Sequence, residues 1–174
     1  MVYPIVKFLR GRGISLMAFM DDFTNQARYR CKAILEIHVI GLVFMCCGWS
    51  INWVKTILDP GTTPIHLGFL WDTVGKTIAL PKDKTTQVES WAKRLLTTKK
   101  TTQEDLESFV GTLISTQPAV WKAPLHFRAL QRLLLISLRQ GRNKCRSVRL
   151  SDYSVVRDLD WCTYSGLRAN RISP

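Results

Sequence analysis

The chain has 174 residues, of which 46% are hydrophobic, and a formal net charge of +12 at pH 7. That hydrophobic content excludes a wholly disordered protein, and the length suits one modest domain or two small ones. The excess charge is +3 over residues 1–80, +5 over 81–141 and +4 over 142–174. Such a protein attracts polyanions, above all nucleic acids, although a basic soluble protein or a complex with an acidic partner is the plainer alternative.

The cysteines indicate a reducing compartment. There are five of them, an odd number, and their spacing matches neither a zinc site nor a disulfide framework. Cys31, Cys46 and Cys47 lie among apolar residues and are predicted to be small core side chains. No secretory signal opens the chain, so we expect an intracellular protein of the cytoplasm or nucleus.

The first chemically informative segment is an apolar run over residues 16–23 that breaks at Asp21-Asp22. The pattern predicts a strand, a tight turn and a second strand, preceded by a helix over 2–9. Two adjacent carboxylates at a hairpin tip suit Mg²⁺, which binds one or two carboxylates together with substrate phosphates. A polar hairpin tip without a metal is the alternative, because Asp also favours turns.

The rest of the first 80 residues is predicted to add one helix and further strands. The apolar stretch 33–54 approaches the length of a membrane span, but Glu36, His38 and glycines interrupt it, so we expect a packed helix and no membrane partner. The predicted elements are a helix from Thr24 or Asn25 to about Met45, a strand over 51–57, and a hairpin whose strands span 65–71 and 77–80.

From Pro81 the apolar period becomes helical. Asp83 is predicted to cap a first helix, Thr102 a second, and Pro124 to open a third that ends at Gly141. The sequence therefore predicts an α+β protein: antiparallel β-hairpins with a packed helix over 1–80, a small three-helix bundle over 81–141, and a basic connecting segment over 142–174.

Three segments in order then suggest a family. The Asp21-Asp22 hairpin is followed by Gly48-Trp49-Ser50-Ile51-Asn52-Trp53-Val54-Lys55-Thr56, and next by Leu67-Gly68-Phe69. This arrangement resembles the reverse transcriptases of LTR-like and DIRS-like retroelements. Leu80-Pro81-Lys82-Asp83-Lys84, Gly111-Thr112-Leu113 and the Ala123–Leu130 segment are similar to motifs of their thumb region.

The resemblance implies a partial polymerase palm, a thumb, and a connection leading towards an absent RNase H region. Phe19 stands where the family has Tyr, and residues 1–15 carry no acidic residue. The fingers and an upstream catalytic aspartate are therefore expected to be missing, and another chain is the candidate source for them. The expected function is that of a fragment of an RNA-directed DNA polymerase, with Mg²⁺ or Mn²⁺ as cofactor and primer-template and deoxynucleoside triphosphates as partners.

The resemblance also assigns roles to residues. Asp21 and Asp22 would hold the metal, and Lys55 would lie near the nucleotide's phosphates, unless it is simply a solvent-facing lysine. A primer grip would consist of Leu67, Gly68, Phe69 and Trp71, residues that could equally pack a plain hairpin. Nucleic-acid contacts are expected from Lys93, Arg94, Lys99, Lys100, Lys122, Arg128 and Arg132, any one of which alone is more simply a solvated cation.

Two other classes of function stay open. A nucleic-acid-binding remnant without catalysis would bind template in a salt-sensitive way that ignores Mg²⁺ and Asp21. A small membrane-associated protein would use the apolar stretch 33–54.

Overall fold

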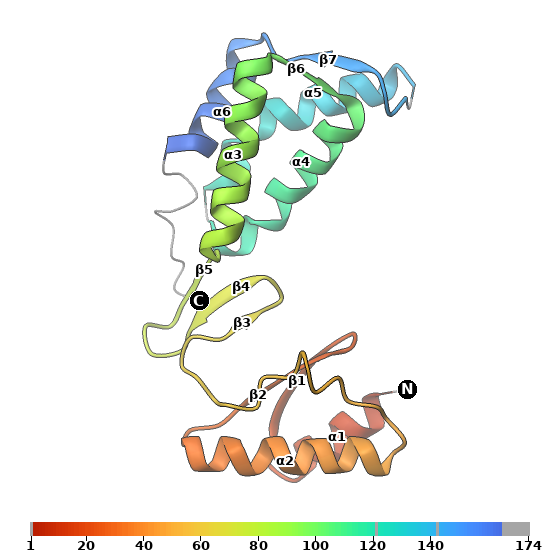
Figure 1. The fold of residues 1–174 in the computed structure, drawn as a ribbon, viewed down its shortest axis with the longest axis vertical. Coiled ribbons are helices and arrows are strands. Elements are labelled where there is room, and N and C mark those ends of the chain that lie inside the picture. Colours follow the sequence, from red (N-terminus) through yellow and green to blue (C-terminus); the bar gives the residue numbers. More distant parts are fainter. Residues whose placement is uncertain (1, 121, 142, 165–174) are drawn as a thin grey trace. The chain divides into compact units, whose positions relative to one another are not determined.

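The computed structural model describes residues 2–120, 122–141 and 143–164. The chain divides into two compact units, residues 1–61 and 62–174 (Figure 1). Helices alternate with small antiparallel sheets, so the α+β class predicted from the sequence is confirmed.

The first unit is a β-hairpin between two helices. Helix α1 (Tyr3–Gly11) leads into strands β1 (Ser15–Phe19) and β2 (Asp22–Gln26), and helix α2 spans Arg30–Cys46. The strands pair antiparallel with Phe19 opposite Asp22, which confirms the strand, turn and strand predicted from the sequence. The buried core of this unit is small and consists of Ile5, Val6, Leu9, Ile14, Leu16 and Phe44.

Two predictions for this unit are wrong. Helix α2 does not begin at Thr24 or Asn25, because both residues belong to β2, where they pair with Met17 and Leu16. Residues 51–57 form no strand and contain a turn instead. Ladder hydrogen bonds from β1 thus outweigh the local capping preference of the two polar residues.

Glu36 explains how a carboxylate fits in an apolar helix. Its residue is only 6% exposed, yet it accepts a hydrogen bond from Asn25 Nδ2 at 3.1 Å and pairs with Lys32 Nζ at 3.5 Å. The Asn25 contact joins α2 to β2, and both contacts offset the cost of burying the charge.

Most of α2 faces outward. Cys31, Cys46 and Cys47 are exposed, which corrects their prediction as core residues, and the buried cysteine is Cys162. Apolar residues occur on every side of α2, but its buried residues are only Ala33, Glu36, Gly41 and Phe44. Among the described residues, no helix has the length and apolar character that crossing a membrane requires. The exposed apolar side chains of α2 are Ile34, Leu35, Val39, Leu42 and Met45.

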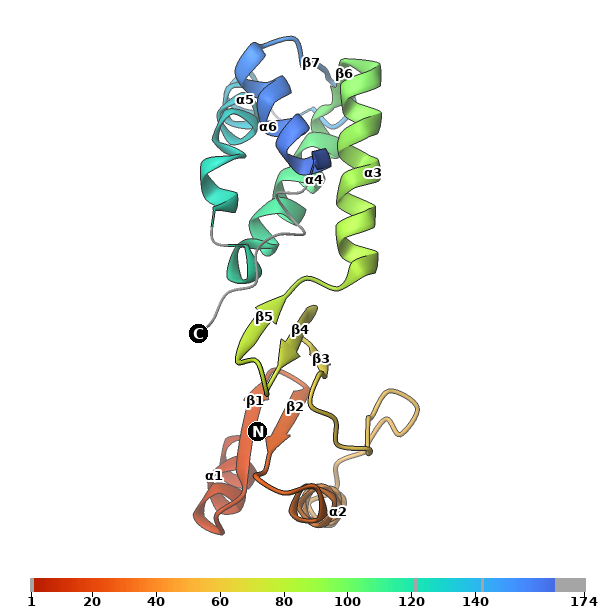
Figure 2. The same cartoon turned by 90° about the vertical axis from the view of Figure 1, so that its left-hand side faces the viewer.

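The second unit joins a three-stranded sheet to a helical bundle. Strands β3 (Ile65–His66), β4 (Phe69–Asp72) and β5 (Thr77–Ala79) form an antiparallel meander. The helices that follow pack around one core, in which Phe109, Phe127 and Leu130 are at most 2% exposed (Figures 1 and 2). They are α3 (Lys82–Thr98), α4 (Gln103–Ser115), the 3₁₀ turns η1 (Gln117–Ala119) and η2 (Ala123–Leu125), α5 (Arg128–Arg139) and α6 (Tyr153–Tyr164).

The segment over 142–174, predicted as a connection, contains a strand and a helix within the residues that the structure describes. Strand β7 (Ser147–Arg149) pairs with β6 (Lys100–Thr102), and α6 packs along α3 and against α5. The bundle thus has a fourth helix beyond the three predicted. The boundary predicted at residue 80 also differs from the observed one at 61, because Phe69, Ile78 and Leu80 pack on the bundle core.

Caps fix two of these helices. Thr102 accepts a hydrogen bond from Asp105 N at 3.1 Å, as its prediction as a capping residue requires. Pro81, not Asp83, occupies the cap position of α3, so that prediction is wrong. Helix α5 has no capping side chain of its own; instead Asp158 Oδ2, from α6, accepts a hydrogen bond from Ala129 N at 2.9 Å.

Beside this cap, His126 stacks on Trp161, with ring centroids 4.4 Å apart and an interplanar angle of 6°. Burial lowers the pKa of His126, and the neighbouring Asp158 carboxylate opposes that shift. Helix α6 therefore holds the start of α5 through a polar cap and an aromatic stack.

Candidate nucleic-acid interface

The hairpin of the first unit presents both carboxylates to solvent. Met20 and Asp21 form the two-residue turn, and Met20 lies in the left-handed region with φ 55°. Asp22 opens β2, and both aspartates are exposed. Within the described residues, no group of three Asp, Glu, His or Cys side chains is placed to hold a metal ion. The donor set suits a Mg²⁺ ion that a nucleotide's phosphates would help to bind, rather than a preformed cage.

Lys55 lies in a turn rather than at the end of the predicted strand. Its backbone N–H donates to Asn52 O at 3.1 Å, and Thr56 Oγ1 donates to the same carbonyl at 2.8 Å. The Lys55 side chain is exposed and makes no ion pair with a described residue. Asn52 therefore shapes the loop that carries this lysine.

The hairpin predicted as a primer grip has a tighter form than expected. Residues 65–71 are not one strand, because Leu67 and Gly68 form a two-residue turn between β3 and β4. Their φ angles are 52° and 77°, and two successive positive values are typical of a type I′ hairpin turn. Gly68 suits this backbone, whereas an L residue such as Leu67 is strained in it.

The other two residues of that hairpin hold it in place. Trp71 Nε1 donates to His66 O at 3.1 Å, which links β3 to β4 through a side chain. Phe69 packs against the bundle core, and the Lys84 ammonium lies 5.4 Å from its ring centroid. These contacts give Phe69 and Trp71 structural roles in the hairpin, while Leu67 remains 41% exposed at its tip.

Replacing Leu67 with Asn should raise the free energy of unfolding by about 1 kcal/mol, because Asn-Gly is the preferred type I′ pair and relieves the left-handed strain of leucine. Urea denaturation would measure the change. Leu125→Asn is the control, since Leu125 is also exposed and its φ is not positive. Equal effects of both substitutions would show that the turn strain contributes nothing.

The seven predicted nucleic-acid cations are all exposed, and none of them pairs with an acidic group among the described residues. They fall into two groups in the second unit. Lys93 and Arg94 lie in the last turns of α3, which Lys99 and Lys100 follow. The remaining three lie before α5 or in its first two turns and are Lys122, Arg128 and Arg132.

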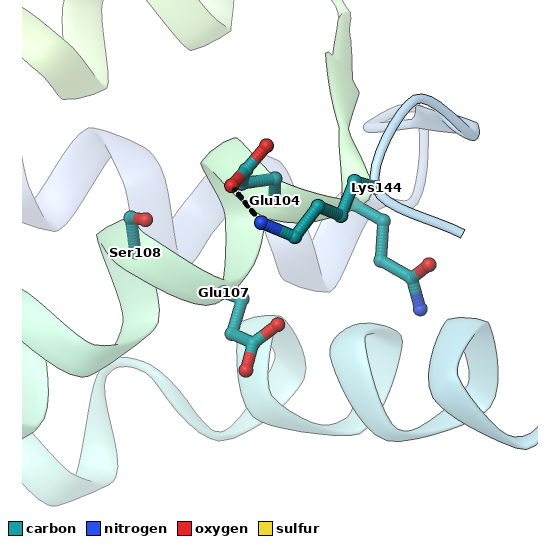
Figure 3. Close-up of a pocket in the computed structure, with 5 residues that line it drawn as sticks. Glu104, Glu107, Ser108 and Lys144 are labelled. Carbon is teal, nitrogen blue, oxygen red and sulfur yellow. Dashed lines mark hydrogen bonds and ion pairs between the residues drawn. The ribbon is translucent and has the colours of Figure 1, made fainter. Parts of the chain in front are cut away.

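Two shallow pockets near α4 differ in their charge. The first, of about 260 Å³, is lined by Gln103, Glu104, Glu107, Ser108 and Lys144. Lys144 Nζ pairs with Glu104 at 2.9 Å, so its cation is already compensated (Figure 3). The second, of about 300 Å³, we call the Arg94 pocket; its lining consists of Arg94, Leu95, Thr98, Lys100, Thr101, Thr102, Asp105 and Ser147.

Two residues of this region, Thr101 and Ser147, were missed by sequence reasoning. Both line the Arg94 pocket and belong to the β6–β7 ladder, in which Arg149 lies directly opposite Lys100. These residues come together because two short polar segments more than forty residues apart pair as strands, and no local sequence pattern reveals that pairing.

Comparison of this chain with family models, curated proteins and solved structures finds no match. Asp21, Asp22 and Lys55 belong to the first unit, and the predicted primer grip and cations belong to the second.

Proposed function

We propose that the protein binds nucleic acid through its second unit, as the palm and thumb portion of a reverse-transcriptase-like polymerase. In this proposal Asp21 and Asp22 hold Mg²⁺ or Mn²⁺ together with the phosphates of a deoxynucleoside triphosphate. The fingers and the third carboxylate are supplied by polypeptide outside residues 1–174.

The observation that carries the proposal is the set of seven exposed cations without acidic partners in the described part of the second unit. Lysines and arginines that pair with no carboxylate lose no salt bridge when they bind phosphate, and their binding releases the counterions condensed on the nucleic acid. Several such contacts are needed for affinity, and their number matters more than the placement of any one.

The strained turn at Leu67 adds independent support. A non-glycine residue held in the left-handed region costs stability, and such strain tends to occur where function requires it. The exposed side chain of Leu67 stands beside Gly68, whose lack of a side chain permits close approach of a nucleic-acid strand. Leu67→Asn is then expected to weaken binding of a primer-template while it raises stability.

A second candidate function is template binding without catalysis. The absence of a third carboxylate near Asp21 and Asp22 in the described residues favours it, because polymerases position two metal ions at phosphorus. Both candidates predict binding that weakens steeply with salt.

One experiment separates them. Primer extension on poly(rA) with oligo(dT) is measured in Mg²⁺ or Mn²⁺, beside fluorescence anisotropy of the same primer-template. Extension by the wild type that Asp21→Asn/Asp22→Asn abolishes would support the polymerase. Equal binding by both proteins without extension would support the binding function alone, and no salt-sensitive binding by either would overturn the proposal.

A further inference from the structure

The Arg94 pocket combines two cations with a group of hydroxyls. Arg94 contributes from the last turns of α3, and Lys100 contributes from β6. The Arg94 guanidinium also lies 5.9 Å from the centroid of the Trp91 ring, a cation–π contact that restrains it. Neither cation pairs with a carboxylate in the described residues. The pocket is therefore a concave surface with uncompensated positive charge.

The hydroxyls differ in what they can still donate. Thr98 Oγ1 already donates to the backbone carbonyls of Arg94 and Lys100 at 3.0 and 2.9 Å. Thr102 Oγ1 accepts the capping bond from Asp105 N and keeps its own proton to donate. Thr101 is 8% exposed, and its buried hydroxyl has no hydrogen-bond partner in the described part of the protein. Thr101 lies opposite the buried Val148, on the inner face of the β6–β7 ladder. Thr102 and Ser147 share the outer face with Lys100, so theirs are the hydroxyls that an anion in the pocket can reach.

The strand pairing gives a second, independent indication of an anion. Lys100 lies directly opposite Arg149 across β6 and β7, on the ladder that also pairs Thr102 with Ser147. Like charges directly opposite each other destabilise a sheet. An anion bound beside Lys100 would offset the repulsion between the two cations.

Two features oppose an anion, and neither outweighs these contacts. Asp105 lines the pocket, which leaves Arg94 and Lys100 with one excess positive charge between them. The carbonyl end of α3 also lies here, but Lys99 N donates to Leu95 O and Thr98 Oγ1 to Arg94 O. The amino end of α4 opens onto the same pocket through Thr102 and Asp105, and a helix amino end favours negative charge.

We propose that the Arg94 pocket binds a phosphate group of a nucleic-acid backbone, held by Arg94 and Lys100 and by the hydroxyls of Thr102 and Ser147. This inference rests on the proposed function and names the first backbone contact of the second unit. It assigns Thr102 and Ser147 to a binding site, and it makes Asp105 the residue that limits affinity.

The test uses the full chain and a fluorescein-labelled single-stranded oligonucleotide, titrated at several salt concentrations. Arg94→Gln/Lys100→Gln should weaken binding about tenfold near 0.1 M salt and reduce the slope of log K against log salt by about 1. Lys82→Gln/Arg139→Gln is the matched control, because it removes the same two charges outside the pocket and should leave the slope unchanged. Equal effects of the two double variants would overturn the proposal, since they would indicate a diffuse field rather than a site.

Two further variants probe the pocket without removing a cation. Ser147→Ala removes a hydroxyl from an exposed position of the pocket lining, so it should weaken binding about threefold to fivefold without loss of thermal stability. Asp105→Asn keeps the backbone N–H that Thr102 caps and removes the opposing charge, so it should tighten binding about threefold. Unchanged affinity in both variants would overturn the proposed contacts.

Titration with inorganic phosphate, followed by amide chemical shifts, distinguishes this inference from the proposed function. Saturable shifts that gather at Thr98, Thr101, Thr102 and Ser147 support the pocket, whereas shifts scattered over the chain overturn it. If the wild type binds phosphate there and no oligonucleotide, the proposed function and the nucleic-acid source both fail. If it binds oligonucleotide and no phosphate shifts appear at these residues, the inference alone fails.

Discussion

Replacing Asp158 with alanine should lower the free energy of unfolding by about 2–3 kcal/mol. Asp158 is 2% exposed, and its carboxylate accepts the Ala129 N–H at 2.9 Å at the start of α5. Helix α5 has no capping side chain of its own, so the alanine variant would leave buried helix N–H groups without an acceptor. Urea denaturation of both proteins at neutral pH measures the difference.

The asparagine variant separates the hydrogen bond from the charge. Burial raises the pKa of the Asp158 carboxyl, and N–H groups of Ala129 and Leu130 oppose the rise. The folded protein therefore holds this proton more tightly than the unfolded chain does. This contribution to the free energy of unfolding is fully present below the pKa that the carboxyl has in the unfolded chain, and it is lost as the pH rises through the pKa of the folded state. Asp158→Asn keeps an acceptor without that charge, so its stability should lie within about 1 kcal/mol of the wild type and lack this pH dependence.

Asp160→Ala provides the control for the Asp158 variants. It removes a carboxylate from the same helix at a partly exposed position that makes no side-chain hydrogen bond to a described residue. Its expected effect is within about 0.5 kcal/mol. Equal destabilisation by Asp158→Ala and Asp160→Ala would contradict the capping role.

What the sequence predicted correctly depends on neighbouring residues. The hairpin around Asp21 follows from an apolar run interrupted by turn residues, and the start of α4 follows from Thr102 three positions before Asp105. Both signals lie within a short stretch of neighbouring residues, so no distant contact is needed to interpret them.

The failures share a dependence on distant contacts. Asn25 is a good cap by itself, but pairing with Leu16 places it in a strand. Strand β6 overlaps the polar residues before α4 and exists because β7 pairs with it. Asp158 belongs to the segment predicted as a connection, but its contact with the start of α5 gives it a structural role. Tertiary context overrides local preference in each case.

The candidate site was predictable in its residues and not in its geometry. Exposed lysines and arginines can be read from composition, and all seven predicted cations are indeed exposed. Only Arg94 and Lys100 of the seven line the Arg94 pocket, and their meeting there depends on where α3 ends and on the β6–β7 ladder.

Hydrogen exchange should show that the two units differ greatly in local stability. Amides of α2 and the β1–β2 hairpin are expected to exchange at least about 100-fold faster than those of α3 and α4. The described core of the second unit contains eighteen buried hydrophobic residues, and that of the first contains six. Few buried contacts mean that local opening costs little, and mass spectrometry of peptides across the chain would report it.

The exposed apolar side of α2 offers an explanation if α2 proves to exchange as slowly as α4. Leu35 and Leu42 are 66% and 58% exposed, so Leu42→Gln should leave the exchange of α2 unchanged if solvent covers that side. A different result would mean that a second copy of the chain covers the exposed side of α2. In that case α2 would be protected from exchange as well as α4 is, the protection would increase with protein concentration, and Leu42→Gln would reduce it. Such a result would contradict the prediction, because the stability of the first unit would then come from association.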